Sequence, residues 1–202
     1  AKLNTNGPIP NWAYADCVIT RTRPAVSSRW RFRRLMRILS NREAPSPDGA
    51  RPPTRVLIGE LTIASVVSHA RRAHPAEACG LLQGGWLVGD IHVADALPAP
   101  NCSPTPERAY RICDDWLLEQ LQRPAEHGAP QPVGAYHAHP DGNLAFSRRD
   151  RAQAWPAWLY LVVAATTVSP GWSAWWADAA GGVREVPVQV ARGATTRRAE
   201  RS

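Results

Sequence analysis

The sequence has no apolar run long enough to cross a membrane. The longest stretch, Trp158–Ala165, has eight residues, whereas a membrane-spanning helix needs about 20. The first residues also lack the apolar segment and small-residue cleavage site of a secretory signal. We therefore expect neither a membrane span nor a secretory signal, and we interpret Trp158–Ala165 as a buried strand.

Cysteine is scarce as well. Cys17, Cys79, Cys102 and Cys113 form no Cys-x-x-Cys pair, which excludes the common zinc-binding and redox motifs of that type. A chain of 202 residues is large enough to bury a core without a framework of disulfides. We therefore expect reduced thiols in a cytoplasmic protein, with Cys79 as a small core residue rather than a nucleophile.

Excess basic charge is missing from most of the chain, although the formal net charge is +7. Residues 1–55 contain eleven basic and three acidic residues, whereas residues 56–202 contain thirteen basic and fourteen acidic residues. The globular part is therefore not basic, and we expect no nucleic-acid partner. Residues 29–39 could form a basic amphipathic helix that contacts an anionic membrane, a nucleic acid or a protein, but we favour a solvated tail.

Proline separates this front segment from the rest of the chain. Seven prolines interrupt the first 55 residues, and no periodic apolar pattern lies between them. We predict a poorly ordered extension over residues 1–55, a single domain over residues 56–190 and a polar tail over residues 191–202.

Within the domain, the pattern predicts strands mixed with a few helices, which indicates a single α/β or α+β domain. Gly84 and Gly85 predict a hairpin turn, and Asp114 is expected to cap a helix. Gly134 fits either a close approach of substrate backbone or a packing requirement. The expected strands are 56–58, 78–83, 86–88, 91–97, 110–112, 133–139, 159–164, 172–176 and 183–190, and the expected helices are 62–73, 114–122 and 147–154.

Tryptophan is abundant, with nine residues, and five of them cluster late in the chain. Such a cluster could line a groove for an extended peptide, but most tryptophans fill protein cores. We expect at least three of the five to be core residues: Trp155, Trp158, Trp172, Trp175 and Trp176.

The first group of candidate functional residues lies between positions 137 and 150. His137 and His139 are two residues apart at the end of an expected strand, so their side chains share one face. Ser147 and Asp150 have the spacing of a capping box, which places Asp150 in the first turn of the following helix. Two imidazoles and one carboxylate suit a catalytic zinc ion, because catalytic sites keep a fourth position open.

The run His137-Ala138-His139-Pro140, six residues, Ser147, two residues and Asp150 resembles the motif of the JAMM, or MPN-domain, metallopeptidases. The segment from Pro75 to Leu82, Pro-Ala-Glu-Ala-Cys-Gly-Leu-Leu, is similar to the upstream motif of the same family. The resemblance implies that Glu77 is the general acid/base and that Ser147 stabilises the oxyanion. Ala138 departs from the Ser or Thr of many members, but its side chain points away from the metal face.

The resemblance covers about residues 56–190 and implies a curved, mostly antiparallel sheet flanked by helices, as in cytidine deaminases. A zinc deaminase itself needs a downstream Pro-Cys-x-x-Cys pair, which this sequence lacks. The implied activity is a Zn²⁺-dependent peptidase or isopeptidase that cleaves after the C-terminal Gly-Gly of a ubiquitin-like sulfur-carrier protein. That tail would lie extended beside a sheet edge. The alternatives are a phage-tail-type cell-wall peptidase and a non-catalytic MPN scaffold, although such scaffolds lack the ligands retained here.

Overall fold

The computed structural model describes residues 51–123, 129–165 and 169–192. The three helices of these residues are α2 (Glu60–Ala73), α3 (Asp114–Gln122) and α4 (Arg148–Gln153). The strands are β1 (Val56–Gly59), β2 (Cys79–Leu87), β3 (Asp90–Ala99), β4 (Gln131–Ala138), β5 (Trp158–Ala164), β6 (Gly171–Ala177), β7 (Val183–Val186) and β8 (Val188–Ala191). The expectations for most of residues 1–55 and of the tail from 191 lie outside the described residues.

The eight strands of the described residues form one sheet in the order β7-β6-β5-β4-β2-β3-β1-β8. β2 and β6 pair antiparallel with both of their neighbours, whereas β4 pairs parallel with β5, and β1 pairs parallel with β3 and β8. β7 and β8 lie at opposite ends of this order, yet only Pro187 separates them in the sequence. The sheet must therefore curl until its two edges come close together.

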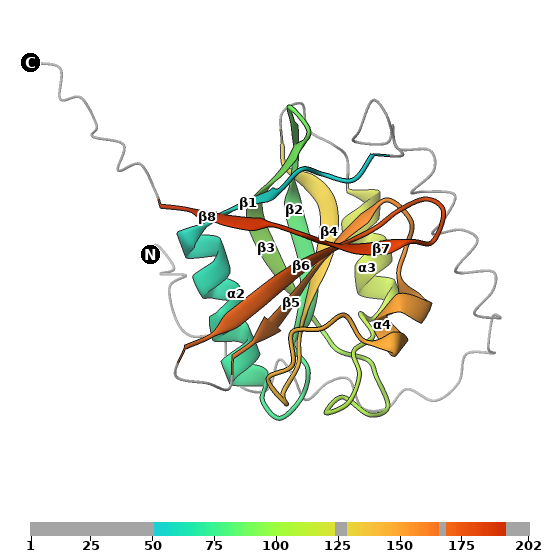
Figure 1. Ribbon diagram of the computed structural model, residues 1–202. Coiled ribbons are helices and arrows are strands. Elements are labelled where there is room, and N and C mark those ends of the chain that lie inside the picture. The colour runs from blue at the N-terminus through green and yellow to red at the C-terminus, as the bar shows by residue number, and fades with distance from the viewer. Residues whose placement is uncertain (1–50, 124–128, 166–168, 193–202) are drawn as a thin grey trace, which may run out of the picture.

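Both faces of the curled sheet are buried. Along β5, Leu159, Leu161 and Val163 belong to the core beneath α2, whereas Tyr160 and Val162 belong to the core that also contains residues of α3. Figure 1 shows α2 on one side of the sheet and α3 and α4 on the other. This two-sided burial explains why β5 is apolar throughout rather than alternating, and the mixed, sheet-dominated α+β single domain is confirmed.

One predicted turn and one predicted strand are wrong in detail. β2 runs through Gly84 and Gly85, and the turn follows at Val88 and Gly89. Gly84 is required instead by close packing, because a Cβ atom there would clash with the carbonyl group of His92. The predicted strand over residues 183–190 is divided into β7 and β8, since Pro187 cannot donate a ladder hydrogen bond.

Smaller corrections concern the loop before α3. The predicted strand over residues 110–112 is reduced to a single bridge between Ile112 and Asn101. Asp114 is the first residue of α3 rather than its cap, because Cys113 occupies the N-cap position. Gly134 serves packing, since a Cβ atom there would clash with the Leu159 carbonyl oxygen of β5.

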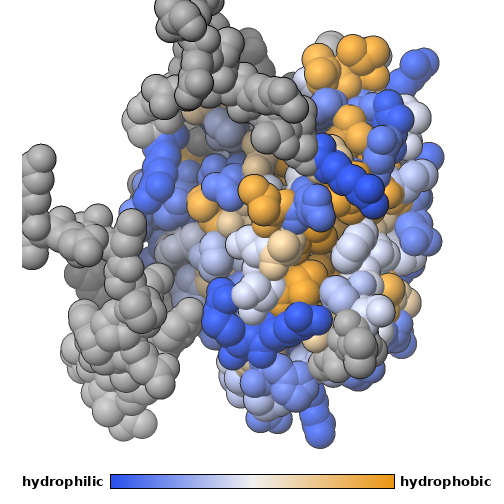
Figure 2. All heavy atoms as spheres, turned by 90° about the vertical axis from the view of Figure 1, so that its left-hand side faces the viewer, coloured by the Kyte–Doolittle hydropathy of each residue, from blue (hydrophilic) through white to orange (hydrophobic). Residues whose placement is uncertain are grey.

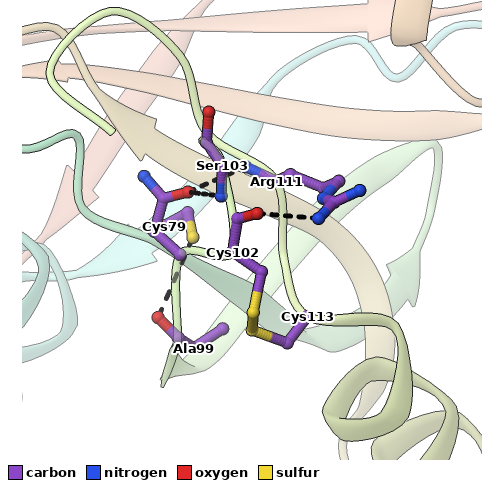
Figure 3. Close-up of a disulfide and its surroundings, with 7 residues drawn as sticks. Cys79, Ala99, Cys102, Ser103, Arg111 and Cys113 are labelled. Carbon is purple, nitrogen blue, oxygen red and sulfur yellow. Dashed lines mark hydrogen bonds between the residues drawn. A yellow bond between two sulfur atoms is a disulfide. The ribbon is translucent and has the colours of Figure 1, made fainter. Parts of the chain in front are cut away.

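The expectation of reduced thiols is wrong for two cysteines. Cys102 and Cys113 form a disulfide that joins positions 11 residues apart, and Figure 3 shows it beside the hydrogen bond from Arg111 to the Cys102 carbonyl. This pairing removes the argument from reduced cysteines for a cytoplasmic location. Cys79 is a free, fully buried core residue as predicted, and Cys17 lies outside the described residues.

The surface in Figure 2 has hydrophobic residues interspersed among hydrophilic ones, as ordinary protein surfaces do. No helix within the described ranges is long and apolar enough to span a membrane. Two of the five late tryptophans are buried core residues, one fewer than the three predicted. Trp158 and Trp176 are buried, while Trp155, Trp172 and Trp175 are partly buried and pack against the two cores.

Candidate metal centre

The two histidines lie at the end of β4, on the side of the sheet away from α2. Tyr136 and Ala138 belong to the core beneath α2, so the side chains of His137 and His139 point to the opposite face. His137 has no exposed surface. The Nε2 atoms of the two rings are 3.0 Å apart. The prediction that these two side chains share one face is therefore confirmed.

Asp150 approaches the same point from the first turn of α4. The Ser147 side chain accepts a hydrogen bond from the Asp150 backbone, and the Asp150 carboxylate accepts one from the Ser147 backbone. This reciprocal pair is the predicted capping box. It holds the two carboxylate oxygens of Asp150 each 3.5 Å from one histidine Nε2.

These residues fit a single metal ion. One potential ligand atom from each of His137, His139 and Asp150 lies within 4.8 Å of the others. Ligands about 2.0–2.1 Å from a tetrahedral zinc are about 3.3 Å apart; the two histidine nitrogens are 3.0 Å apart, and each lies 3.5 Å from a different Asp150 oxygen. The Nδ1 atom of His139 donates to the Asn143 carbonyl at 2.7 Å, so in the neutral ring the Nε2 lone pair is directed at the centre.

The protonation tendencies of Asp150 and His137 suit metal binding, whereas the raised pKa of His139 means that a metal must displace a proton there. Burial raises the pKa of Asp150, but hydrogen bonds from His137 and His139 outweigh burial and hold that pKa well below its usual value. Burial lowers the pKa of His137 despite the nearby carboxylate. For His139, burial also lowers the pKa, but bonds to Asp150 and Asn143 raise it overall. A metal ion requires an ionised carboxylate and neutral imidazoles.

Glu77 lies beside these ligands. Cys79 of β2 pairs with His137 of β4, and the Ala138 N–H donates to the Ala78 carbonyl. The same antiparallel register continued by two residues places Glu77 next to His139. The carboxyl is buried, and burial raises its pKa to about 7, with the His139 charge lowering it and the Asp150 charge raising it. A carboxyl that titrates near neutral pH suits proton transfer.

The Cys79 thiol is not a candidate nucleophile. Burial, followed by the charge of Glu77, raises its pKa to about 12, so the thiolate is scarce at neutral pH. The thiol contacts the Ala99 carbonyl, as Figure 3 shows. The prediction that Cys79 is a core residue therefore agrees with its electrostatics as well as its burial.

Comparison with known protein families identifies the family of this chain. Residues 60–178 match the family described as prokaryotic homologs of the JAB domain. The chain belongs to the prokaryotic JAB-domain family. The resemblance to JAMM/MPN proteins inferred from Glu77, His137, His139 and Asp150 is thereby confirmed at the level of the family.

Three individual proteins resemble this chain to different degrees. A desampylase of Haloferax volcanii is 35% identical over 103 residues, which cover 48% of this chain and 72% of that protein. A solution structure of a protein from Desulfitobacterium hafniense has a TM-score of 0.60 and 24% identity, covering 68% of this chain and 94% of that one. A Salinibacter ruber protein has a TM-score of 0.49 and 24% identity, covering 69% and 92%. The Desulfitobacterium structure supports the fold alone.

Two residues of this JAB-domain site were missed by the sequence analysis. The ring of Tyr110 stacks on His137 with centroids 4.3 Å apart, and the Asn101 amide donates to the Glu77 carbonyl at 2.9 Å. Both residues lie in the proline-rich loop before α3. The only sequence signal was a polar residue and an aromatic residue in that loop, and neither spacing nor periodicity relates them to positions 77 and 137.

Proposed function

We propose that this JAB-domain protein is a zinc-dependent isopeptidase or peptidase. The observation that carries the proposal is the convergence of His137, His139 and Asp150 within 4.8 Å, next to the buried carboxyl of Glu77. Three protein ligands and an adjacent acid/base are the composition of a hydrolytic zinc site. The finer substrate proposal is the bond after the C-terminal Gly-Gly of a ubiquitin-like sulfur-carrier protein or its conjugate.

In this proposal the three ligands hold the metal and the remaining residues move protons. When bound, zinc supplies Lewis-acid activation of a water molecule and of the scissile carbonyl. The Glu77 carboxylate accepts the proton of the attacking water and then donates it to the departing amine. Glu77 is buried, and the Asn101 side chain donates a hydrogen bond to its backbone carbonyl.

Ser147 has a hydroxyl group beside the proposed metal centre. Its Oγ accepts from the Asp150 backbone at 3.1 Å, and its side chain also bonds the Asp150 carboxylate, so the O–H would have to turn from that carboxylate to serve the oxyanion. A donor at this position would stabilise the negative charge that develops on the scissile carbonyl oxygen. The capping role and the catalytic role of Ser147 are therefore compatible.

The similarity to a protein named a desampylase supports removal of a protein modifier as the reaction. The scaffold alternative is disfavoured because a scaffold has no need of the ligand set, and no described feature favours the cell-wall peptidase alternative.

The test is hydrolysis of a carrier protein ending in Gly-Gly and joined through that end to a reporter protein. In Glu77→Gln we expect zinc content equal to wild type and a turnover reduced by about 10²–10⁴-fold, measured by mass spectrometry of the released carrier. Glu60→Gln, which changes an exposed carboxylate of α2, is the matched control with unchanged turnover. Wild-type turnover in Glu77→Gln would exclude Glu77 as the proton carrier.

A further inference from the structure

The two histidine ligands differ in how their second ring nitrogen is held. His139 donates from Nδ1 to the Asn143 carbonyl. The Nδ1 atom of His137 is buried and has no hydrogen-bond partner within the described parts of the chain. Metal-binding histidines are usually oriented by a hydrogen bond at this atom, so the His137 ring requires another means of orientation.

Aromatic packing is the contact that His137 makes instead. The Tyr110 ring lies nearly parallel to the imidazole, with an interplanar angle of 20° and centroids 4.3 Å apart. Phe146 contacts the imidazole at a greater distance, 6.4 Å, and is tilted by 55°. A parallel stack at 4.3 Å restricts rotation of the imidazole about its Cβ–Cγ bond, because rotation would drive the ring into the tyrosine.

Tyr110 is itself fixed on both sides by one side chain. The Asn101 amide donates to the Ala109 carbonyl at 3.2 Å and accepts from the Arg111 N–H at 3.0 Å. These are the peptide groups that flank Tyr110. The same amide donates to the Glu77 carbonyl, so Asn101 links the position of Tyr110 to the backbone of the proposed acid/base.

The disulfide closes the loop that carries Tyr110. Cys102 and Cys113 are joined covalently, and the Cys102 N–H donates to the Arg111 carbonyl at 2.7 Å. A hydrogen bond from the Cys113 N–H to the Pro100 carbonyl, at 3.2 Å, ties the far end of the loop back to its start. Tyr110 therefore projects from a short, covalently closed loop rather than from a free one.

We propose that Tyr110 is a positioning residue for His137, which it holds by stacking in the orientation that a metal ligand requires. The inference rests on the proposed metal site. Metal-binding histidines are usually oriented by a hydrogen-bonding partner at Nδ1. Here the loop closed by Cys102 and Cys113 orients His137 instead. The Tyr110 ring, not its hydroxyl group, provides this orientation.

The test compares Tyr110→Leu with Tyr110→Phe in the full chain. Competition with a chromophoric chelator gives the zinc Kd, and the visible absorption of the Co²⁺-loaded protein reports the ligand geometry. We expect Tyr110→Leu to raise the zinc Kd by about 10–100-fold, as loss of an orienting partner does, and to change the Co²⁺ spectrum. Tyr110→Phe keeps the stack, so its Kd and spectrum match wild type. Trp155→Leu, which removes a half-buried aromatic ring away from His137, controls for general loss of packing.

The outcomes separate this inference from the proposed function. If wild type does not bind zinc, the proposed metal site fails. If wild type binds zinc and folded Tyr110→Leu binds it with the same Kd and Co²⁺ spectrum, only the positioning role is overturned. Should Tyr110→Leu not fold, the NMR signal of the His137 Cδ2–H provides the measurement. We expect an upfield ring-current shift of this signal in wild type and in Tyr110→Phe. If the wild-type signal showed no such shift, the stack would be overturned.

Discussion

At the scale of single residues, the centre combines groups that are held from different directions. His139 is held by a backbone carbonyl, His137 by an aromatic ring, and Asp150 by the capping box it shares with Ser147. Each ligand thus has its own support, which reduces the entropy lost when a metal is bound. The proposed acid/base, Glu77, comes from the segment before β2 and needs no change of fold to reach them.

Ser147→Ala separates the two roles of this residue. Loss of the cap should lower the free energy of unfolding by about 0.5–2 kcal/mol, and loss of an oxyanion donor should lower kcat by about 10²–10³-fold. Ser147→Thr retains both the hydroxyl and the cap and serves as the control. Thermal unfolding and steady-state kinetics check the two effects, and an unchanged kcat in Ser147→Ala would leave only the capping role.

The convergence of the three proposed ligands could be predicted from sequence because they are local. His137, His139 and Asp150 lie within 14 positions of one another, and strand alternation and the capping box fix their directions. Tyr110 and Asn101 could not be predicted, because their contacts depend on how the loop before α3 folds over β2 and β4. Such contacts between distant segments leave no periodic pattern in the sequence.

At the scale of the elements, the buried pair of His69 and Tyr136 connects α2 to β4. Nδ1 of His69 lies 2.8 Å from the Tyr136 hydroxyl. Tyr136 directly precedes the proposed ligand His137 in the sequence. Burial, and then the charge of Arg72, lowers the pKa of His69. The folded protein therefore holds this imidazole neutral at a pH where the unfolded chain protonates it.

This pair gives a pH-dependent stability of known sign. Below the ordinary histidine pKa of about 6.5, the unfolded chain binds a proton that folded His69 resists, so stability falls as the pH falls. In zinc-free protein between pH 7 and 5, we expect the free energy of unfolding of wild type to fall more steeply than that of His69→Gln. The difference is at most about 1.4 kcal/mol per pH unit. Urea unfolding checks it, and parallel slopes would show that His69 does not titrate on unfolding.

The elements that sequence analysis misjudged share one cause. Gly84 and Gly85 have turn composition, but Gly84 is needed for the close approach of β3, and tertiary packing outweighed the local turn signal. Pro187 was a visible strand breaker, yet its consequence, a chain that leaves one sheet edge and joins the other, depends on the curl of the whole sheet. Local sequence therefore predicts where the strands lie along the chain better than which strands pair with one another in the sheet.

At the scale of the whole molecule, the proposed chemistry is confined to the domain that follows the basic front segment. Every proposed functional residue lies from Glu77 onward, whereas residues 1–55 hold eleven of the 24 basic residues. The described chain already contacts the domain at Thr54 and Arg55, which bond to Gly89 and Asp90. Arg51 is therefore a suitable first residue for a shortened protein.

A chain beginning at Arg51 should bind zinc and cleave a short model isopeptide as wild type does. Cleavage of an acidic carrier protein should become slower at low salt and similar at high salt, because a basic segment raises association rates through screened electrostatics. Zinc content and kcat/KM at two ionic strengths check this. Loss of zinc or of model-peptide cleavage would place residues 1–50 within the functional domain.

Zinc content measured by elemental analysis tests the central claim most directly. We predict about one zinc per chain in wild type and its loss in His139→Ala, because the substitution removes one of three ligands. His92→Ala, which removes a half-buried histidine of β3 outside the centre, should retain the wild-type zinc content. Equal zinc in His139→Ala and wild type, or no zinc in wild type purified without chelator, would contradict the assignment of His137, His139 and Asp150 as the metal centre.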